Sequence, residues 1–291
     1  MKDQPLLRGC GTALVTPFRN GAVDTEAYRR LVERQVGAGI DFLVPLGTTA
    51  ETPCLTDEEK VTILRITREA AGARPVVAGC GTNSLTGTLR NIELLSPLGP
   101  DAFLVVTPYY NKPTQEGLYR YFEAVARAAG RPIVLYNVPG RTGVNLGAET
   151  TLRLARVPGI IAVKEASGNL EQILRICRER PEGFRVLSGN DDQTLPLMAS
   201  GADGVISVVA NIAPVPMRAL TQAVLAGDLS QAIALNNRLI PLHKACFLES
   251  NPIPVKGGLS LMGLCRSEMR LPLTEATPAT LACLKSIIDT L

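Results

Sequence analysis

One lysine stands where a buried strand is expected to end. Lys164 follows the apolar run 160–163 and precedes the polar segment 165–169. A lysine with the usual pKa of about 10.4 carries an ammonium ion, which is not a nucleophile. Burial disfavours the charged form, so a buried lysine can present a free amine that forms a Schiff base with a carbonyl. We interpret Lys164 as such a nucleophile; the alternative is a lysine that extends from a strand end into solvent.

Polar residues and glycines follow the other apolar segments in the same way. They are Gly47, Thr48, Thr49, Tyr109, Tyr110, Arg141 and Gly189, with Tyr136 near the end of its own segment. Short threonine side chains beside a glycine can direct N–H groups and hydroxyls towards a carboxylate, although Gly-Thr-Thr is also common in turns. A phenol at Tyr136 could stand beside the nucleophile, and the Arg141 guanidinium could bind a second carboxylate. The alternatives are a half-buried tyrosine, a surface arginine and a tyrosine pair that packs in a protein interface.

The composition excludes several classes of function. The 291 residues are 46% hydrophobic, which is ample for the core of one large domain. The 30 basic and 27 acidic residues give a net charge of +3 without a basic block, and this argues against nucleic-acid binding. The N-terminal residues lack the pattern of a signal peptide, and no apolar run is long enough to cross a membrane. We therefore expect a cytoplasmic protein with no membrane partner.

Metal and cofactor chemistry has little support in the sequence. The single histidine, His243, excludes a site with several histidines and would have to serve any Ser-His or Cys-His pair. The seven cysteines are irregularly spaced without Cys-x-x-Cys, which argues against a disulfide framework and against a zinc site. We expect no metal and no cofactor. Proton transfer must then come from tyrosine, carboxylate, lysine or the substrate.

Eight apolar segments alternate with amphipathic segments, a pattern typical of repeated βα units. The expected strands are 12–16, 41–46, 75–78, 102–107, 132–137, 160–164, 185–188 and 204–207. The expected helices are 25–37, 56–71, 84–98, 115–129, 148–156, 170–180, 193–200 and 214–226. Asp24, Thr56 and Ser84 stand at expected N-caps, and Glu59 completes a capping box with Thr56.

These units predict an α/β fold, a closed (β/α)8 TIM barrel over residues 1–227. Residues 228–291 are expected to form a C-terminal helical appendage with helices at 229–248, 255–264 and 278–288. An open doubly wound sheet is the alternative, but no Gly-x-Gly-x-x-Gly follows the first strand. In a TIM barrel the carboxyl ends of the strands build the active site, so the polar residues described above would meet there.

Five spaced motifs extend the argument beyond single residues. They are Gly47-Thr48-Thr49-x-Glu51, Thr107-Pro108-Tyr109-Tyr110-Asn111-x-Pro113, Tyr136-Asn137-Val138-Pro139-x-Arg141-Thr142-Gly143, Lys164-Glu165-x-x-Gly168 and Asn251-Pro252-Ile253-Pro254-x-Lys256. With these motifs the chain resembles, nearly from end to end, the class I pyruvate-dependent aldolases of the dihydrodipicolinate synthase and N-acetylneuraminate lyase family. Thr48-Thr49, the Tyr110 motif and Pro-x-Arg141-Thr are most similar to the dihydrodipicolinate synthase branch.

The resemblance implies a reaction and its catalytic residues. The reaction is the aldol condensation of pyruvate with L-aspartate 4-semialdehyde to 4-hydroxy-tetrahydrodipicolinate, in the biosynthesis of diaminopimelate and lysine. Lys164 would form an imine with pyruvate, whose positive charge acidifies the methyl group and permits an enamine. Tyr136 would transfer protons beside the imine, and Thr48 would connect it to Tyr110 of a neighbouring subunit.

The resemblance also implies the binding residues and the assembly. Thr49 and its backbone would hold the pyruvate carboxylate, and Arg141 would bind the carboxylate of the semialdehyde. Gly189 and Ile206 would line the pocket through backbone groups. The partners would be these two small molecules and further copies of the chain, since the family is commonly a homotetramer built from tight dimers.

Two departures from the family pattern have predicted consequences. Ala50 replaces the usual glycine of Gly-Thr-Thr-Gly-Glu, which costs about 1 kcal/mol if that position needs a positive φ and otherwise only narrows the loop. Lysine-inhibited members place histidine and glutamate around a pocket at the dimer interface. The matching positions here are Asp57, Lys60 and Gly87. The resemblance therefore implies weak or absent feedback inhibition by lysine.

Three other functions compete with this interpretation. A sister aldolase or lyase acting on sialic acid or a keto-deoxy sugar acid would favour hydroxyl-binding side chains in place of Arg141. A non-catalytic barrel that keeps the pyruvate pocket would be expected to have lost Lys164, Tyr136 or Thr48, and all three are present. A phosphate-binding barrel enzyme is disfavoured because the loop 208–211 lacks a glycine-rich anion nest.

Overall fold

The strands close into a parallel barrel in the computed structural model, which describes residues 7–291. Eight strands form one sheet in the order β4-β1-β10-β9-β8-β7-β6-β5, and a parallel bridge between Leu43 and Val76 joins its two edges. The bounds are β1 Gly9–Ala13, β4 Phe42–Val44, β5 Val77–Gly79, β6 Ala102–Val106, β7 Ile133–Asn137, β8 Ile160–Glu165, β9 Arg185–Ser188 and β10 Gly204–Ser207. The predicted TIM barrel is confirmed.

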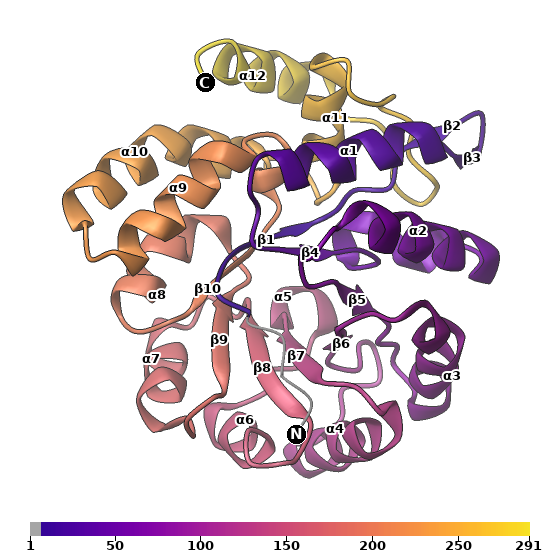
Figure 1. The fold of residues 1–291 in the computed structure, drawn as a ribbon, viewed down its shortest axis with the longest axis vertical. Coiled ribbons are helices and arrows are strands. Elements are labelled where there is room, and N and C mark those ends of the chain that lie inside the picture. Colours follow the sequence, from indigo (N-terminus) through magenta and orange to yellow (C-terminus); the bar gives the residue numbers. More distant parts are fainter. Residues whose placement is uncertain (1–6) are drawn as a thin grey trace.

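The helices surround the strands as a ring (Figure 1). Their bounds are α1 Thr25–Gly37, α2 Asp57–Ala70, α3 Leu85–Leu95, α4 Gln115–Ala129, α6 Ala148–Leu154, α7 Leu170–Glu179, α8 Thr194–Ala199 and α9 Pro214–Leu225. The side chains of Asp24, Thr56 and Ser84 accept the predicted N-cap hydrogen bonds, and Glu59 completes the capping box with Thr56. These local signals fix where α1, α2 and α3 begin, and therefore how long each connecting loop is.

The C-terminal region is helical, as predicted. It contains α10 Leu229–Ala245, α11 Ile253–Leu261 and α12 Pro278–Ile288. Figure 1 shows α10 beside α9, and α12 packs against both α10 and α11. Among residues 7–291, no helix combines the length and the hydropathy that crossing a bilayer requires.

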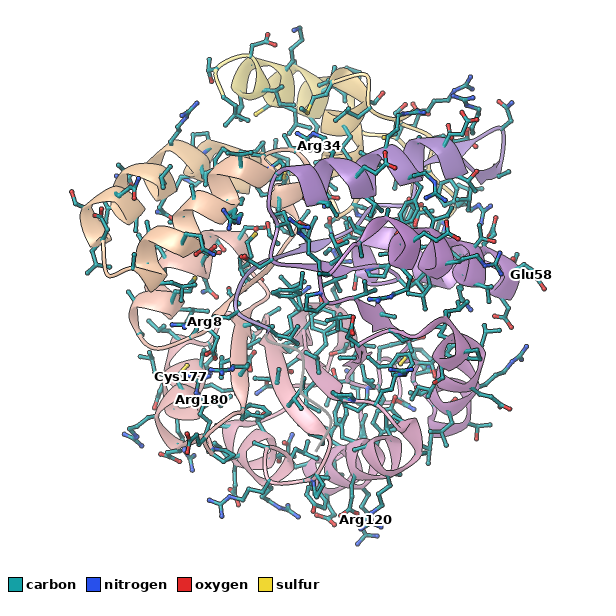
Figure 2. The ribbon with its side chains drawn as sticks, viewed as in Figure 1. Arg8, Arg34, Glu58, Arg120, Cys177 and Arg180 are labelled. Atoms are coloured by element: carbon teal, nitrogen blue, oxygen red, sulfur yellow. The ribbon has the colours of Figure 1, made fainter. Side chains whose placement is uncertain are left out.

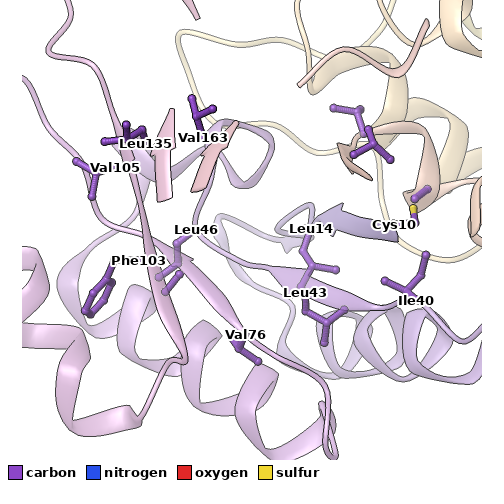
Figure 3. Close-up of a cluster of buried hydrophobic side chains, with 14 of the residues drawn as sticks. Cys10, Leu14, Ile40, Leu43, Leu46, Val76, Phe103, Val105, Leu135 and Val163 are labelled. Carbon is purple, nitrogen blue, oxygen red and sulfur yellow. The ribbon is translucent and has the colours of Figure 1, made fainter. Parts of the chain in front are cut away.

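The hydrophobic core has two layers separated by the barrel wall. Alternate residues of each strand face opposite sides, so Val134 and Tyr136 belong to the cluster inside the barrel, whereas Leu135 belongs to the cluster between strands and helices. Figure 3 shows part of the outer layer, with Leu135 and Val163 on neighbouring strands. On the outermost surface, Glu58 of α2 and Arg120 of α4 point away from the barrel (Figure 2). This alternation decides which residues reach the interior.

The predicted position of the first strand was wrong. The sequence indicated residues 12–16, but β1 spans Gly9–Ala13. A Cβ atom on Gly11 would lie 2.1 Å from the Phe42 ring, so only glycine lets this ring pack inside the barrel. Because glycine contributes nothing to a hydrophobic pattern, the strand's first half was invisible in the sequence.

Two short strands and one short helix were also absent from the prediction. Strands β2 (Phe18–Arg19) and β3 (Ala22–Val23) form an antiparallel hairpin after β1. Helix α5 is a single turn, Pro139–Thr142, in the loop after β7. A single helical turn is too short to show a periodic pattern, although Pro139 occupies a position near its N-terminus that proline favours.

Candidate active site

The register of neighbouring strands brings Lys164 and Tyr136 together. Tyr136 on β7 is paired with Lys164 on β8, and both side chains face the interior because they share the parity of Val134 and Ala162. The Nζ atom of Lys164 lies 4.4 Å from the centroid of the Tyr136 ring. Lys164 is only 5% exposed, so the alternative of a lysine extended into solvent is wrong. A buried amine beside a phenol has the components for imine chemistry with proton transfer.

The residue after the lysine fixes the end of β8 from the outer side of the barrel. The buried carboxylate of Glu165 accepts hydrogen bonds from the Asn137 side chain at 3.0 Å and the Gln172 side chain at 3.0 Å. It also accepts one from the backbone N–H of Ser167 at 2.9 Å. Burial raises the pKa of Glu165, while these hydrogen bonds act in the opposite direction. The network ties the end of β8 to the end of β7 and to α7, and so holds the Lys164 backbone in place.

A cavity of about 340 Å³ opens at the carboxyl ends of the strands, the size class of small-molecule sites. Three predicted site residues, Thr48, Tyr136 and Arg141, line it together, along with Tyr109, Lys60 and Cys80. Lys164 is not itself a lining residue, but its amine packs against the ring of Tyr136, which is. The cavity therefore joins the neighbourhood of a buried amine to that of a guanidinium.

The Thr48-Thr49 segment is a 3₁₀ turn, Thr48–Ala50, directly after β4. The N–H groups of Thr48 and Thr49 begin this turn and have no acceptor within it, so both are available to an anion. The positive φ of 54° falls on Glu51 and not on Ala50. The alanine that replaces the family's glycine therefore carries no left-handed strain, and the cost considered for that case does not arise.

A buried ion pair holds this turn against the C-terminal region. The Lys256 ammonium contacts the Glu51 carboxylate, and both side chains are fully buried. Glu51 also accepts the backbone N–H of Arg270 at 3.1 Å. Lys256 lies over the Phe18 ring, 4.3 Å from its centroid, and donates to the carbonyl of Glu268 at 3.0 Å. These contacts give Lys256 a structural role.

Sequence reasoning did not give Asn251 a place in the site. Its side-chain amide donates to the hydroxyl of Thr49 at 3.0 Å, and its backbone carbonyl accepts from the Arg141 guanidinium at 3.1 Å. Arg141 itself stands on α5, whose single turn directs the loop back over the strand ends. The available signal was the Asn251-Pro252-Ile253-Pro254-x-Lys256 motif, which marked the segment without showing what it touches.

Comparison with known proteins agrees with this geometry. The sequence profile of the dihydrodipicolinate synthetase family matches residues 6–291. The chain belongs to this family. It is 46% identical over 288 residues to the 4-hydroxy-tetrahydrodipicolinate synthase of Thermotoga neapolitana, covering 97% of this chain and 98% of that protein.

Solved structures of the dihydrodipicolinate synthetase family share the fold closely. The dihydrodipicolinate synthase of Thermotoga maritima superposes with a TM-score of 0.96 at 44% identity, covering 97% of this chain and 98% of that one. The chloride-inhibited enzyme of Acinetobacter baumannii, in complex with pyruvate, superposes with a TM-score of 0.95 at 41% identity, covering 97% and 98%. The predicted family and barrel are confirmed.

The remaining candidate residues of this family member, Thr49, Tyr110, Gly189 and Ile206, are not among those that line the cavity. Tyr110 is 88% exposed and has a positive φ of 75°. Gly189 follows β9, where a Cβ atom would lie 2.6 Å from that of Ala166, and Ile206 is fully buried on β10. The cavity thus unites Thr48, Tyr136 and Arg141, while Tyr110 points outwards from the same chain.

Proposed function

We propose that the protein is a 4-hydroxy-tetrahydrodipicolinate synthase that condenses pyruvate with L-aspartate 4-semialdehyde. The observation that carries the proposal is the buried Lys164 amine against the Tyr136 ring, at one side of a cavity whose lining includes Arg141. The sister-aldolase alternative is disfavoured because a guanidinium suits a carboxylate better than the hydroxyls of a sugar acid.

In the proposed reaction, the Lys164 amine attacks the keto carbon of pyruvate and water leaves, giving an imine. Loss of a methyl proton then gives an enamine, which attacks the aldehyde carbon and forms the new carbon–carbon bond. The amine of the semialdehyde attacks the imine carbon, closes the ring and frees Lys164. The Tyr136 ring packs against the amine, and its phenol is proposed to transfer these protons, with Thr48 on the same cavity connecting it to a further phenol.

The two carboxylates of the substrates require separate positive sites. Thr49, with the free N–H groups of its turn, is proposed to hold the carboxylate of pyruvate. Arg141 is proposed to bind the carboxylate of the semialdehyde at the rim, where its guanidinium lies beside the cavity. Gly189, directly after β9, and Ile206 on β10 lie outside the cavity lining and are proposed to contact the substrate on the Lys164 side through backbone groups.

We propose that the enzyme works as a homotetramer made of tight dimers. The support is Tyr110, whose exposed phenol and unfavourable φ suit a side chain that reaches into the site of an adjoining subunit. The seven unpaired cysteines suit the reducing conditions of the proposed cytoplasmic location.

The division at residues 227 and 228 is likewise a proposal. Residues 228–291 are an appendage by topology, since the barrel closes without them. Asn251 and Lys256 nevertheless contact the loop after β4, so we propose that the appendage belongs to the catalytic unit.

The test is reduction of a trapped imine. Protein incubated with pyruvate and borohydride should gain a pyruvate-derived mass on the peptide that contains Lys164. Lys164→Ala should lose the adduct, whereas Lys285→Ala, which removes an exposed lysine on α12, should retain it. No adduct on folded wild-type protein would refute the Schiff-base mechanism. Turnover of the semialdehyde, compared with sugar acids, then identifies the second substrate.

A further inference from the structure

Asn251 lies between the two groups proposed to bind the substrate carboxylates. It is only 5% exposed, its amide donates to Thr49, and its carbonyl accepts from Arg141. Within residues 7–291 its side-chain oxygen has no hydrogen-bond partner. A buried amide costs free energy unless its groups are paired, so a half-paired amide at this position calls for an explanation.

The hydrogen bond determines what the Thr49 hydroxyl can do. A hydroxyl has one proton to donate and lone pairs that accept. In residues 7–291 the Thr49 hydroxyl makes this one hydrogen bond, in which the amide N–H of Asn251 occupies a lone pair. The hydroxyl proton therefore remains free and is directed away from the amide. An anionic acceptor such as a carboxylate is the group that this arrangement favours.

A second contact prevents the two segments from moving apart. Glu51, two residues after Thr49, is paired with Lys256, five residues after Asn251. Both ends of the 251–256 segment are thus joined to the turn that carries Thr49. Because the Lys256–Glu51 pair is fully buried, a shift of the 251–256 segment would separate two buried charges, which is costly.

We propose that Asn251 is a positioning residue that orients the Thr49 hydroxyl so that its proton meets the carboxylate of pyruvate. This inference rests on the proposed function, which gives Thr49 that ligand. In this arrangement Asn251 influences pyruvate binding through its side chain, which donates to the Thr49 hydroxyl. It contacts Arg141 through its backbone carbonyl, which every substitution retains. A change of side chain should therefore affect the two substrates differently.

Two substitutions separate this role from simple packing. Asn251→Ala should raise the KM for pyruvate about tenfold, as expected for loss of a hydrogen bond that supports a charged acceptor. Asn251→Asp should raise it further, because a carboxylate would accept the Thr49 proton and repel the pyruvate carboxylate. If Asn251 only filled space, the nearly isosteric aspartate would be the milder change. The KM for the semialdehyde should stay within about twofold in both variants, as for an unchanged contact.

The experiment measures both KM values and the rate of borohydride trapping for the wild type and the two variants. Gln35→Ala is the matched control, because Gln35 is a buried amide whose hydrogen bonds go to Thr12 and to the Ala210 carbonyl, and to neither Thr49 nor Arg141. It should leave both KM values unchanged. Thr49→Val removes the hydroxyl that Asn251 is proposed to orient, and it should raise the KM for pyruvate. Adding Asn251→Ala to this variant should cause no further increase.

Three results would overturn the inference: an aspartate variant milder than the alanine variant, equal increases in both KM values, or a pyruvate KM unchanged in Thr49→Val. The last remains decisive if the Asn251 variants do not fold. Absence of any pyruvate adduct on the wild type would instead overturn the proposed function, so the two failures are distinguishable.

Discussion

Replacing Lys256, which does not line the cavity, should strongly destabilise the protein. Lys256→Met removes the ammonium and keeps a side chain of similar length among the same neighbours. The Glu51 carboxylate would then stay buried, and among residues 7–291 its remaining hydrogen-bond donor would be the Arg270 backbone N–H. Removing one partner of a buried pair costs about 3–5 kcal/mol, a large part of the stability of most domains.

The partner substitution should show a pH dependence of known sign. Burial lowers the pKa of Lys256 below 10.5, and the Glu51 carboxylate opposes that shift. In Glu51→Gln the opposing charge is gone, so the folded-state pKa falls further below the unfolded value. A base with a depressed pKa regains stability as pH rises, because the folded state then no longer holds a buried charge. The loss in Glu51→Gln should therefore be smaller at pH about 10 than at pH about 7.

The assay is urea denaturation at fixed protomer concentration, comparing wild type, both single variants and the double variant. The double variant should be more stable than the sum of the single losses predicts, since no uncompensated charge remains. Lys285→Met is the control, because its pair with Asp289 is 63% and 57% exposed and should contribute no more than about 1 kcal/mol. Equal losses for Lys256→Met and Lys285→Met would refute the reasoning from burial.

Three further predictions follow from the site and its surroundings. Tyr136→Phe should lower kcat by about 10²–10⁴ while Lys164 is still trapped by borohydride, since the phenol transfers protons; an unchanged kcat would contradict this. Arg270 lowers the pKa of Glu59 below 4.5, so the ion pair should stabilise the protein fully at neutral pH. In urea titrations, the stability difference between wild type and Glu59→Gln should vanish as pH falls through the lowered pKa. A difference that does not depend on pH would exclude the ion pair as its cause. L-Lysine should inhibit weakly or not at all, because at the positions that match the effector pocket the Asp57 carboxylate is already paired with the Lys60 ammonium at 2.9 Å. Strong inhibition at sub-millimolar lysine in a steady-state assay would refute this.

The predicted helices show which boundaries can be derived from neighbouring residues alone. Helices α1, α4 and α12 begin and end at the predicted residues, because amphipathic spacing and capping side chains are properties of neighbouring residues. The strands after β1 were placed nearly as well by their apolar runs. The first strand was misplaced because its glycines are required by close neighbours from other parts of the chain, the Asp41 carboxylate at Gly9 and the Phe42 ring at Gly11.

The sequence by itself determined the barrel, the family and the position of Lys164 at a strand end, because each depends on patterns within short stretches of chain. It could place Tyr136 near Lys164 only as an expectation, and the register of β7 against β8 decided it. The link between Thr49 and Asn251 joins residues 202 positions apart, and no local pattern reports such a contact. Only the packing of the C-terminal helices against the barrel brings Asn251 and Lys256 to the loop after β4, and this packing depends on the whole chain.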